Sequence, residues 1–336
     1  MKRTLIAAAA VLAAGGAFAQ SSVQIYGRVN TSVERQKAGD VSTTVMQNNA
    51  SRWGLRGSED LGGGLKGLFV LESGFNSDTG GLTQAGAIFG RESWVGVEGN
   101  FGRVRLGNMG QSAAYYATAD YISMHNHDTG TSSDAFYTYP GFKQNTIAYN
   151  TPSFGGLVLE AQYGLKETVV GGKNTAQLVA NYDRGPLHLG ASYLQGPTTI
   201  DGVTFNDSKQ YGLRALYELG AVTLGAYYIR DNLDEAVGGA VADAKRNSYR
   251  VSAMYTIGAS ELHANVGYAD KFKVGGTKID DSNALQYTLA YNYNLSKRTK
   301  VYAFYTKVNN KANSSYFTGV DNADFSSFAL GVRHNF

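Results

Sequence analysis

The chain has 336 residues and is nearly neutral, with 30 basic and 27 acidic side chains. This balance excludes a protein that binds nucleic acid through overall charge, and the absence of cysteine excludes disulfides, thiolate nucleophiles and zinc–sulfur sites. Tyrosine (23), phenylalanine (15) and glycine (42) are abundant. These residues suit either a soluble core or a membrane barrel, in which aromatic side chains form interfacial girdles.

The N-terminal segment has the pattern of a secretory signal peptide. Lys2 and Arg3 form a basic start, residues 5–12 are apolar, and an Ala-Phe-Ala tripeptide follows as a small-residue cleavage site. We therefore expect residues 1–19 to be cleaved, leaving residues 20–336 as a single transmembrane domain. The alternative, a buried N-terminal helix, does not explain the cleavage pattern. Beyond this segment no apolar run approaches the roughly 18 residues that a membrane-spanning helix needs.

The rest of the chain alternates apolar and polar side chains in short runs. In the first run, Val23, Ile25, Val29 and Val33 share one face, because side chains along a strand point alternately to opposite sides. Small and charged side chains are too numerous to fill a dry interior, so we expect the apolar faces to contact lipid. Sixteen strands are expected, in chain order at residues 22–34, 51–60, 65–75, 89–99, 103–109, 143–152, 157–166, 175–183, 187–195, 209–218, 222–231, 247–257, 261–271, 285–295, 299–309 and 325–336.

Short turns and longer polar loops alternate between these runs. The loop expected between the first two strands passes through residues 36–50, and the longest loop, the third, covers residues 110–142. All four prolines fall in or beside connectors, as expected for residues that cannot donate to a strand ladder. The pattern predicts an all-β fold, a 16-stranded antiparallel transmembrane β-barrel whose lumen is too wide for side chains to fill.

Several motifs resemble those of Gram-negative general porins of the betaproteobacterial (neisserial and burkholderial) type. The motifs are SRWGLRGSEDLGGGL at residues 51–65, NFG at 100–102, YNTPSFGG at 149–156, NLSKRT at 294–299 and GVRHNF at 331–336. The resemblance covers the mature chain and implies a homotrimeric porin of the outer membrane that passes small ions and hydrophilic solutes. It also implies that the third loop folds into the pore, that lipid and lipopolysaccharide surround the barrel, and that Phe336 assists assembly.

The same resemblance implies residues of the pore constriction. Arg52 and Arg91 correspond to arginines of the family's pore wall, Glu72 to a wall carboxylate, and Asp120 to an acid of the third loop that faces the pore. The chain departs from the family at Asn30, where aspartate is common. Arg28 is an additional base, and the remainder of the third loop matches poorly.

The charges themselves also indicate a selective filter. The third loop has no lysine or arginine but contains Asp120, Asp128 and Asp134. If the loop folds inward, these acids face the strand arginines across water, and a surplus of arginine favours anions. The alternative is that the arginines form local ion pairs with Glu59, Asp60 or Glu98. The strands supply Arg28, Arg52, Arg56, Arg103 and Arg105, and we include Arg28, Arg56 and Arg105 in the constriction.

Strict alternation places Arg91 on the outer face of its strand, next to an inward Glu92. Only a bulge, or a position beyond the lipid band, would turn Arg91 into the pore. Arg91 is therefore expected in the constriction on the resemblance and against the strand pattern.

Two further motifs lack the context that their chemistry needs. Gly62, Gly64 and Gly67 match a dinucleotide-binding spacing, but that motif requires a helix after the glycines, and here a strand is expected. His125 and His127 could ligate a metal, although a polar loop explains them without one. We expect no cofactor and no metal.

Two other classes of barrel are alternatives to a channel. An enzymatic barrel would need a His/Asp or Ser/His cluster at hydrogen-bonding distance, and neither His188 nor His263 has a nucleophile nearby in the sequence. An anchor or adhesin would not need arginines that face an acidic loop. The expectation is a channel and not an enzyme, and the sequence leaves its radius, preferred solute and gating open.

Overall fold

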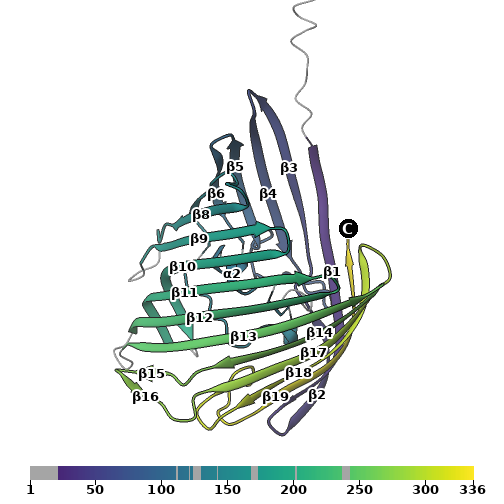
Figure 1. Ribbon diagram of the computed structural model, residues 1–336, viewed down its shortest axis with the longest axis vertical. Helices are drawn as coiled ribbons and strands as arrows, with labels where there is room; N and C mark the ends of the chain where they lie inside the picture. Colours follow the sequence, from purple (N-terminus) through teal and green to yellow (C-terminus); the bar gives the residue numbers. More distant parts are fainter. Residues whose placement is uncertain are drawn as a thin grey trace, which may run out of the picture.

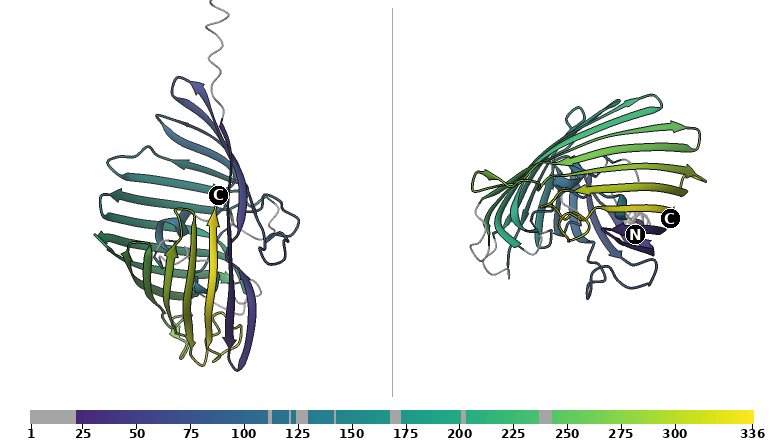
Figure 2. Two further views of the ribbon diagram at one scale, coloured as in Figure 1. Left: turned by 90° about the vertical axis from the view of Figure 1, so that its right-hand side faces the viewer. Right: turned by 90° about the horizontal axis from the view of Figure 1, so that it is seen from below.

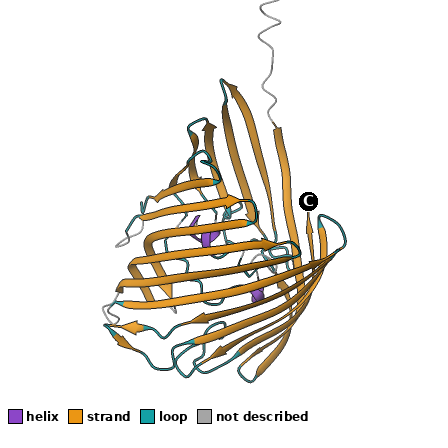
Figure 3. Cartoon of the chain, viewed as in Figure 1, coloured by secondary structure: helices purple, strands orange, loops and turns teal. Residues whose placement is uncertain are grey.

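The computed structural model describes residues 22–110, 113–120, 122–123, 130–141, 143–167, 173–200, 203–236 and 243–336. The predicted signal segment 1–19 lies outside the described residues, as do His125, His127 and Asp128. Among the described residues, no helix is both long and apolar enough to cross a membrane. Nearly all of the ordered segments are strands, and the two short helices lie inside the strand wall (Figure 3).

The elements of the first half are β1 Ser22–Ala38, β2 Val41–Asn48, β3 Arg52–Gly62, β4 Leu65–Gly74, β5 Glu92–Gly99, β6 Gly102–Asn108, α2 Ala113–Thr118, η1 Gly130–Ser132, β7 Thr146–Asn150, β8 Leu157–Gly164 and β9 Thr175–Arg184. Those of the second half are β10 Leu187–Ile200, β11 Val203–Leu219, β12 Val222–Ala236, β13 Ala244–Ile257, β14 Ser260–Ala269, β15 Lys273–Val274, β16 Thr277–Lys278, β17 Ala284–Asn294, β18 Thr299–Asn310 and β19 Phe325–Asn335. Every strand pairs antiparallel with its neighbours (Figure 1).

The first and last strands close the sheet into a barrel. β1 pairs with β19 from Arg28–Asn335 to Ala38–Phe325, and the purple and yellow strands lie side by side in Figure 2. β2 and β3 are two parts of one barrel strand, because both pair with β1. β15–β16 is a hairpin whose first strand pairs with the loop end of β13, beyond β14. The described strand segments thus form a closed 16-stranded barrel, which confirms the predicted fold class. Closure pairs the strand edges that lipid would otherwise leave without hydrogen bonds.

The two faces of the wall differ as the alternation predicted. On β1, Val29 and Val33 are exposed on the outer face, whereas Asn30, Ser32 and Glu34 are buried inside. The same division continues along the barrel, so the outer surface is mainly apolar and suited to lipid.

The expected loop through residues 36–50 is wrong, because most of that segment is strand. β1 and β2 join through the tight turn Gly39–Asp40, and their pairing continues to Thr31–Asn48. Val41, Thr43 and Val45 are β-branched, a composition that favours strands and outweighs the polar character of the segment. At the other end of the barrel, Gly62–Gly64 have positive φ angles and lead into β4, so these glycines make a turn into a strand.

The third loop folds into the barrel. Ala113, Ala114 and Ala117 of α2 pack against Val179 of β9 and Leu194 of β10, both on the inner wall. The first part of the loop therefore lies on the side of β9–β12, as Figure 1 shows for α2. Its second part reaches the opposite wall, where Phe136 packs against Val308 of β18 and Thr131 donates to Glu34 of β1 at 2.6 Å.

Candidate functional site

Four basic side chains form a row on the inner wall across four neighbouring strands. Arg28 of β1 lies opposite Arg52 of β3. On the other side of β1, Asn30 lies opposite Arg333 of β19, which in turn lies opposite Lys300 of β18. Strand parity puts all four side chains on the lumenal face, in one sector of the wall, where Lys300 is paired with Glu261 of β14 at 3.1 Å.

Arg28 is a buried cation of this row. Its side chain is 8% exposed, and among the described residues no carboxylate lies within 4.0 Å of it. Its Nε and Nη1 atoms have no hydrogen-bond partner in that part of the chain. A buried cation without a partner is costly in a dry core but is tolerated in a water-filled lumen.

Glu72 contacts two arginines at the β3 end of the row. Its carboxylate accepts a hydrogen bond from Arg91 at 2.6 Å and lies 3.7 Å from Arg52. Arg91 precedes β5, so the alternation of that strand does not constrain its side chain, and Glu92 starts β5 in register with Glu72. The structure therefore brings Arg52, Glu72 and Arg91 together, and Arg91 reaches the lumen from a loop and not through a bulge.

Asp120 lies on the loop side of the lumen, just after α2. Its side chain is buried, and its backbone N–H donates to the carbonyl of Tyr115 at 3.2 Å. Burial raises the pKa of Asp120 to about 6, although Arg52, Arg28 and Arg214 oppose this rise. Asp120 is thus near enough to these arginines for their charges to act on its carboxylate, and it forms no ion pair with them among the described contacts.

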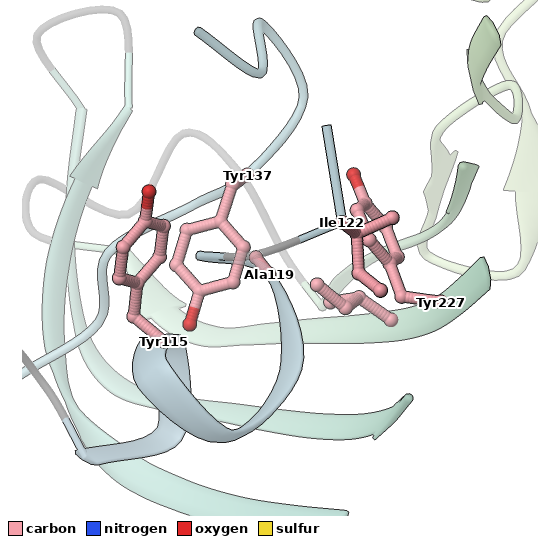
Figure 4. Packing of buried hydrophobic residues seen from close by; sticks show 6 residues of the cluster. Tyr115, Ala119, Ile122, Tyr137 and Tyr227 are labelled. Atoms are coloured by element: carbon pink, nitrogen blue, oxygen red, sulfur yellow. The ribbon is translucent and has the colours of Figure 1, made fainter. Parts of the chain in front are cut away.

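Apolar contacts hold the first part of the third loop against the wall. Tyr115, Ala119 and Ile122 pack with Tyr137, and with Tyr227 of β12 (Figure 4). At Gly190 of β10, an added Cβ would lie 1.8 Å from the Ala117 carbonyl oxygen. The backbone of α2 therefore approaches this strand as closely as a glycine permits.

Asp134 is not a pore acid, which corrects the expectation that the acids of the third loop face the bases across water. Its carboxylate is buried and pairs with Arg250 of β13 at 2.8 Å. It also accepts a hydrogen bond from Tyr227 and one from the Phe136 N–H at 2.8 Å. These contacts make Asp134 an anchor of the loop.

The remaining arginines have local partners. Arg56 donates to Gln24 at 2.8 Å and lies over the ring of Tyr26, in an exposed position nearer the short-turn end. Arg105 pairs with Glu160 at 2.6 Å and lies over the ring of Trp94. Arg103 pairs with Glu98, as the local-ion-pair alternative anticipated. The structure places Arg56 and Arg105 on the lumenal wall but outside the group of Arg28, Arg52, Glu72, Arg91 and Asp120.

Sequence reasoning missed Arg333, Lys300 and Arg214. Parity was the available signal for Arg333, because Leu330 and Val332 are lipid-facing. Arg214 donates to the Tyr116 carbonyl at 3.2 Å and so connects β11 to α2. No group of three or more histidine, aspartate or glutamate side chains in the described ranges could hold a metal ion.

The C-terminal residue completes the closure of the wall. Phe336 exchanges backbone hydrogen bonds with Gly27, at 3.0 and 3.1 Å. A Cβ on residue 27 would lie 2.4 Å from the Phe336 ring, so glycine leaves the space that the aromatic ring occupies.

Comparison with known proteins gives consistent matches over nearly the whole chain. The family model described as Gram-negative porin matches residues 6–314. Outer membrane porin protein 32 of Delftia acidovorans is 33% identical, and an outer membrane porin protein of Bordetella pertussis is 29% identical, each with 100% of both chains covered. Among solved structures, an anion-selective porin from Comamonas acidovorans superposes with a TM-score of 0.74 at 28% identity, covering 94% of this chain and 100% of that one.

Proposed function

The chain belongs to the Gram-negative porin family, and on this premise we propose that it is a general diffusion channel of the outer membrane that prefers anions. Small hydrophilic solutes and ions would pass between the basic wall and the third loop. Arg28, Arg52, Glu72, Arg91 and Asp120 would form the constriction, with Arg56 and Arg105 lining its approach.

The observation that carries this proposal is the row of basic side chains on β3, β1, β19 and β18. Within it, Arg28 has no carboxylate within ion-pair distance in the described part of the chain. At 4 Å, a unit charge attracts a counter-ion by about 1 kcal/mol in bulk water and about 4 kcal/mol near a protein surface. A row of like charges therefore raises the local concentration of anions and repels cations.

Acidic groups moderate this field without reversing it. Glu72 neutralises part of the charge of Arg52 and Arg91, and Asp120 opposes the row from the loop. Lys300 is paired with Glu261 at 3.1 Å, and Arg28 and Arg333 keep the net charge of the row positive. A solved relative described as an anion-selective porin supports the same preference.

Assembly and export are part of the proposal. We expect a homotrimer that contacts outer-membrane lipid and lipopolysaccharide, formed after cleavage of residues 1–19. Phe336 would help insertion, since its backbone and ring join the ends of the wall at Gly27. The family consists of channels, so passage and not catalysis is the proposed activity.

The test is reconstitution of the mature protein in a planar bilayer of neutral lipid under a KCl gradient. Stepwise conductance is expected, with a zero-current potential displaced toward the equilibrium potential of chloride. A displacement toward that of potassium would refute the anion preference, and hydrolase activity without conductance steps would refute the channel.

A further inference from the structure

We propose that the outer surface of β12–β14, together with the β15–β16 hairpin, binds phosphate groups of a lipopolysaccharide headgroup. This inference rests on the proposed function only in placing lipopolysaccharide around the barrel. It goes further by assigning a particular site, which lies outside the pore and on the lipid-facing side of the wall.

A row of tyrosines marks the membrane interface on these strands. Tyr228 of β12 lies opposite Tyr249 of β13, which lies opposite Tyr268 of β14. Their neighbours Ile229 and Ser248 are buried on the inner face, so the tyrosines point outward. Outward aromatic rows of this kind lie at the level where the hydrocarbon meets the headgroups.

The cations lie beyond this row, on the side of the long loops. Arg230 is two residues further along β12 than Tyr228, and Lys245 is four residues from Tyr249 on β13. At the rise of a strand these separations are about 7 and about 13 Å. Because the porin family's loops leave the barrel at this end, the cations lie at headgroup height in the outer leaflet.

Three lysines occupy directly opposed positions on neighbouring strands, where their charges repel. Lys245 lies opposite Lys273, and Lys273 lies opposite Lys278. Lys245 contacts Asp243 at 2.8 Å, whereas Lys273 and Lys278 have no carboxylate within 4.0 Å among the described residues. Like charges in directly opposed positions destabilise a sheet. A bound anion between them would remove this repulsion.

Arg230 adds a guanidinium group to the same surface. It donates only to neutral side chains in the described contacts, Asn232 at 3.2 Å and Asn247 at 3.4 Å. The nearby carboxylate of Asp270 accepts from Asn247 at 3.0 Å and from Tyr249 at 3.3 Å, and so is already engaged. The planar guanidinium can bind two oxygens of one phosphate at once, while lysines contribute mobile point charges.

These groups line a cleft of 430 Å³, whose lining also includes the buried Arg246. Lys271 also lines it and is paired with Asp280 at 2.7 Å. Lys245, Lys271 and Arg246 are each paired with an aspartate. The other lining cations are Arg230, Lys273 and Lys278, and Asp270 is the one carboxylate among the described residues of the lining. The lining therefore carries an excess of positive charge. Because the cleft lies at the height of the lipid headgroups, a lipid phosphate is the anion that it is best placed to bind.

The test compares the folded full-length mature protein with the triple variant Arg230→Gln/Lys273→Gln/Lys278→Gln. The matched control is Arg184→Gln/Lys297→Gln/Arg298→Gln, which removes the same charge from exposed positions in or beside the short turns. Binding is measured in detergent with lipid A carrying two phosphates, with dephosphorylated lipid A and with inorganic phosphate. Conductance in a bilayer free of lipopolysaccharide checks separately that each variant forms a channel.

The expected result is binding of bisphosphorylated lipid A that weakens about tenfold in the triple variant, but not in the control. Without lipid, the triple variant should unfold at the same or a higher temperature, because repulsion is relieved. Equal binding by the triple variant, an equal loss in the control, or equal affinity for dephosphorylated lipid A would overturn the proposal. Inorganic phosphate bound as tightly as the lipid would overturn it too.

Discussion

Arg28 of β1 lies directly opposite Arg52 of β3, so two guanidinium groups occupy neighbouring positions on one patch of the inner wall. Like charges in this relationship weaken a sheet. Arg52 is compensated by Glu72 at 3.7 Å, whereas Arg28 has no comparable partner in the described part of the chain. The pair therefore lowers stability while it raises the positive potential in the lumen, which is the expected arrangement for charges that act on permeating ions.

Replacing Arg28 by glutamine should reduce the anion preference and leave the barrel as stable as before, or more stable by up to about 1 kcal/mol, because a like-charge pair is removed. The zero-current potential in a salt gradient measures the first effect and thermal unfolding in detergent the second. A large drop in unfolding temperature would mean that Arg28 has a structural role.

Replacing Arg52 by serine should lower the anion-to-cation permeability ratio by about threefold, since one charge is lost from a focused field. Glu72 keeps its contact with Arg91, so the wall should remain folded. Arg184→Ser is the control, because it removes an equal charge from an exposed position at a short turn. An unchanged reversal potential in the Arg52 variant would remove this residue from the constriction.

The anion preference should increase as the pH falls through about 6. Burial raises the pKa of Asp120 to about 6, and Asp120 belongs to the loop and not to a membrane-spanning strand. Above this pH the carboxylate is negative and repels anions, and below it the group is neutral. Reversal potentials between pH 8 and pH 4.5 test the change. In Asp120→Asn the step should vanish, and a step that persists would assign it to another group.

Breaking the Asp134–Arg250 pair should loosen the third loop. Removing one member of a buried ion pair leaves an unpaired charge and costs about 3 to 5 kcal/mol. Asp134→Asn is therefore expected to lower the unfolding temperature and to increase current noise in single-channel records. The double variant Asp134→Asn/Arg250→Gln should be less damaged than Asp134→Asn. Quiet currents and an unchanged unfolding temperature in the single variant would show that the loop is held by other contacts.

Most strands of the wall could be predicted, because the alternation of apolar and polar side chains can be recognised within each short segment of sequence. The period of two distinguishes Val29 from Asn30 without knowledge of any partner strand, and it would also have identified Arg333 as lumenal. The alternation failed for residues 36–50, where polar strand residues extend beyond the expected apolar band. The alternation gave the wrong face for Arg91, because β5 begins at Glu92 and Arg91 lies in the loop before it.

The interior of the lumen could not be predicted in the same way. Asp134 and Arg250 are 116 positions apart in sequence, and their contact depends on where the loop lies in the closed barrel. An acid in a polar loop has the same local pattern whether it faces the pore or anchors the loop. Only the folded structure shows that Asp134 is paired with Arg250 whereas Asp120 is not in such a pair among the described contacts.

The close approach of α2 to Gly190 fixes how far the first part of the third loop stands from β10. A larger side chain at position 190 would push α2 away from β10 and narrow the passage. Because Gly190 and the cations of β1, β3, β18 and β19 lie on different strands, the position of α2 and the charge of the wall can change through different residues.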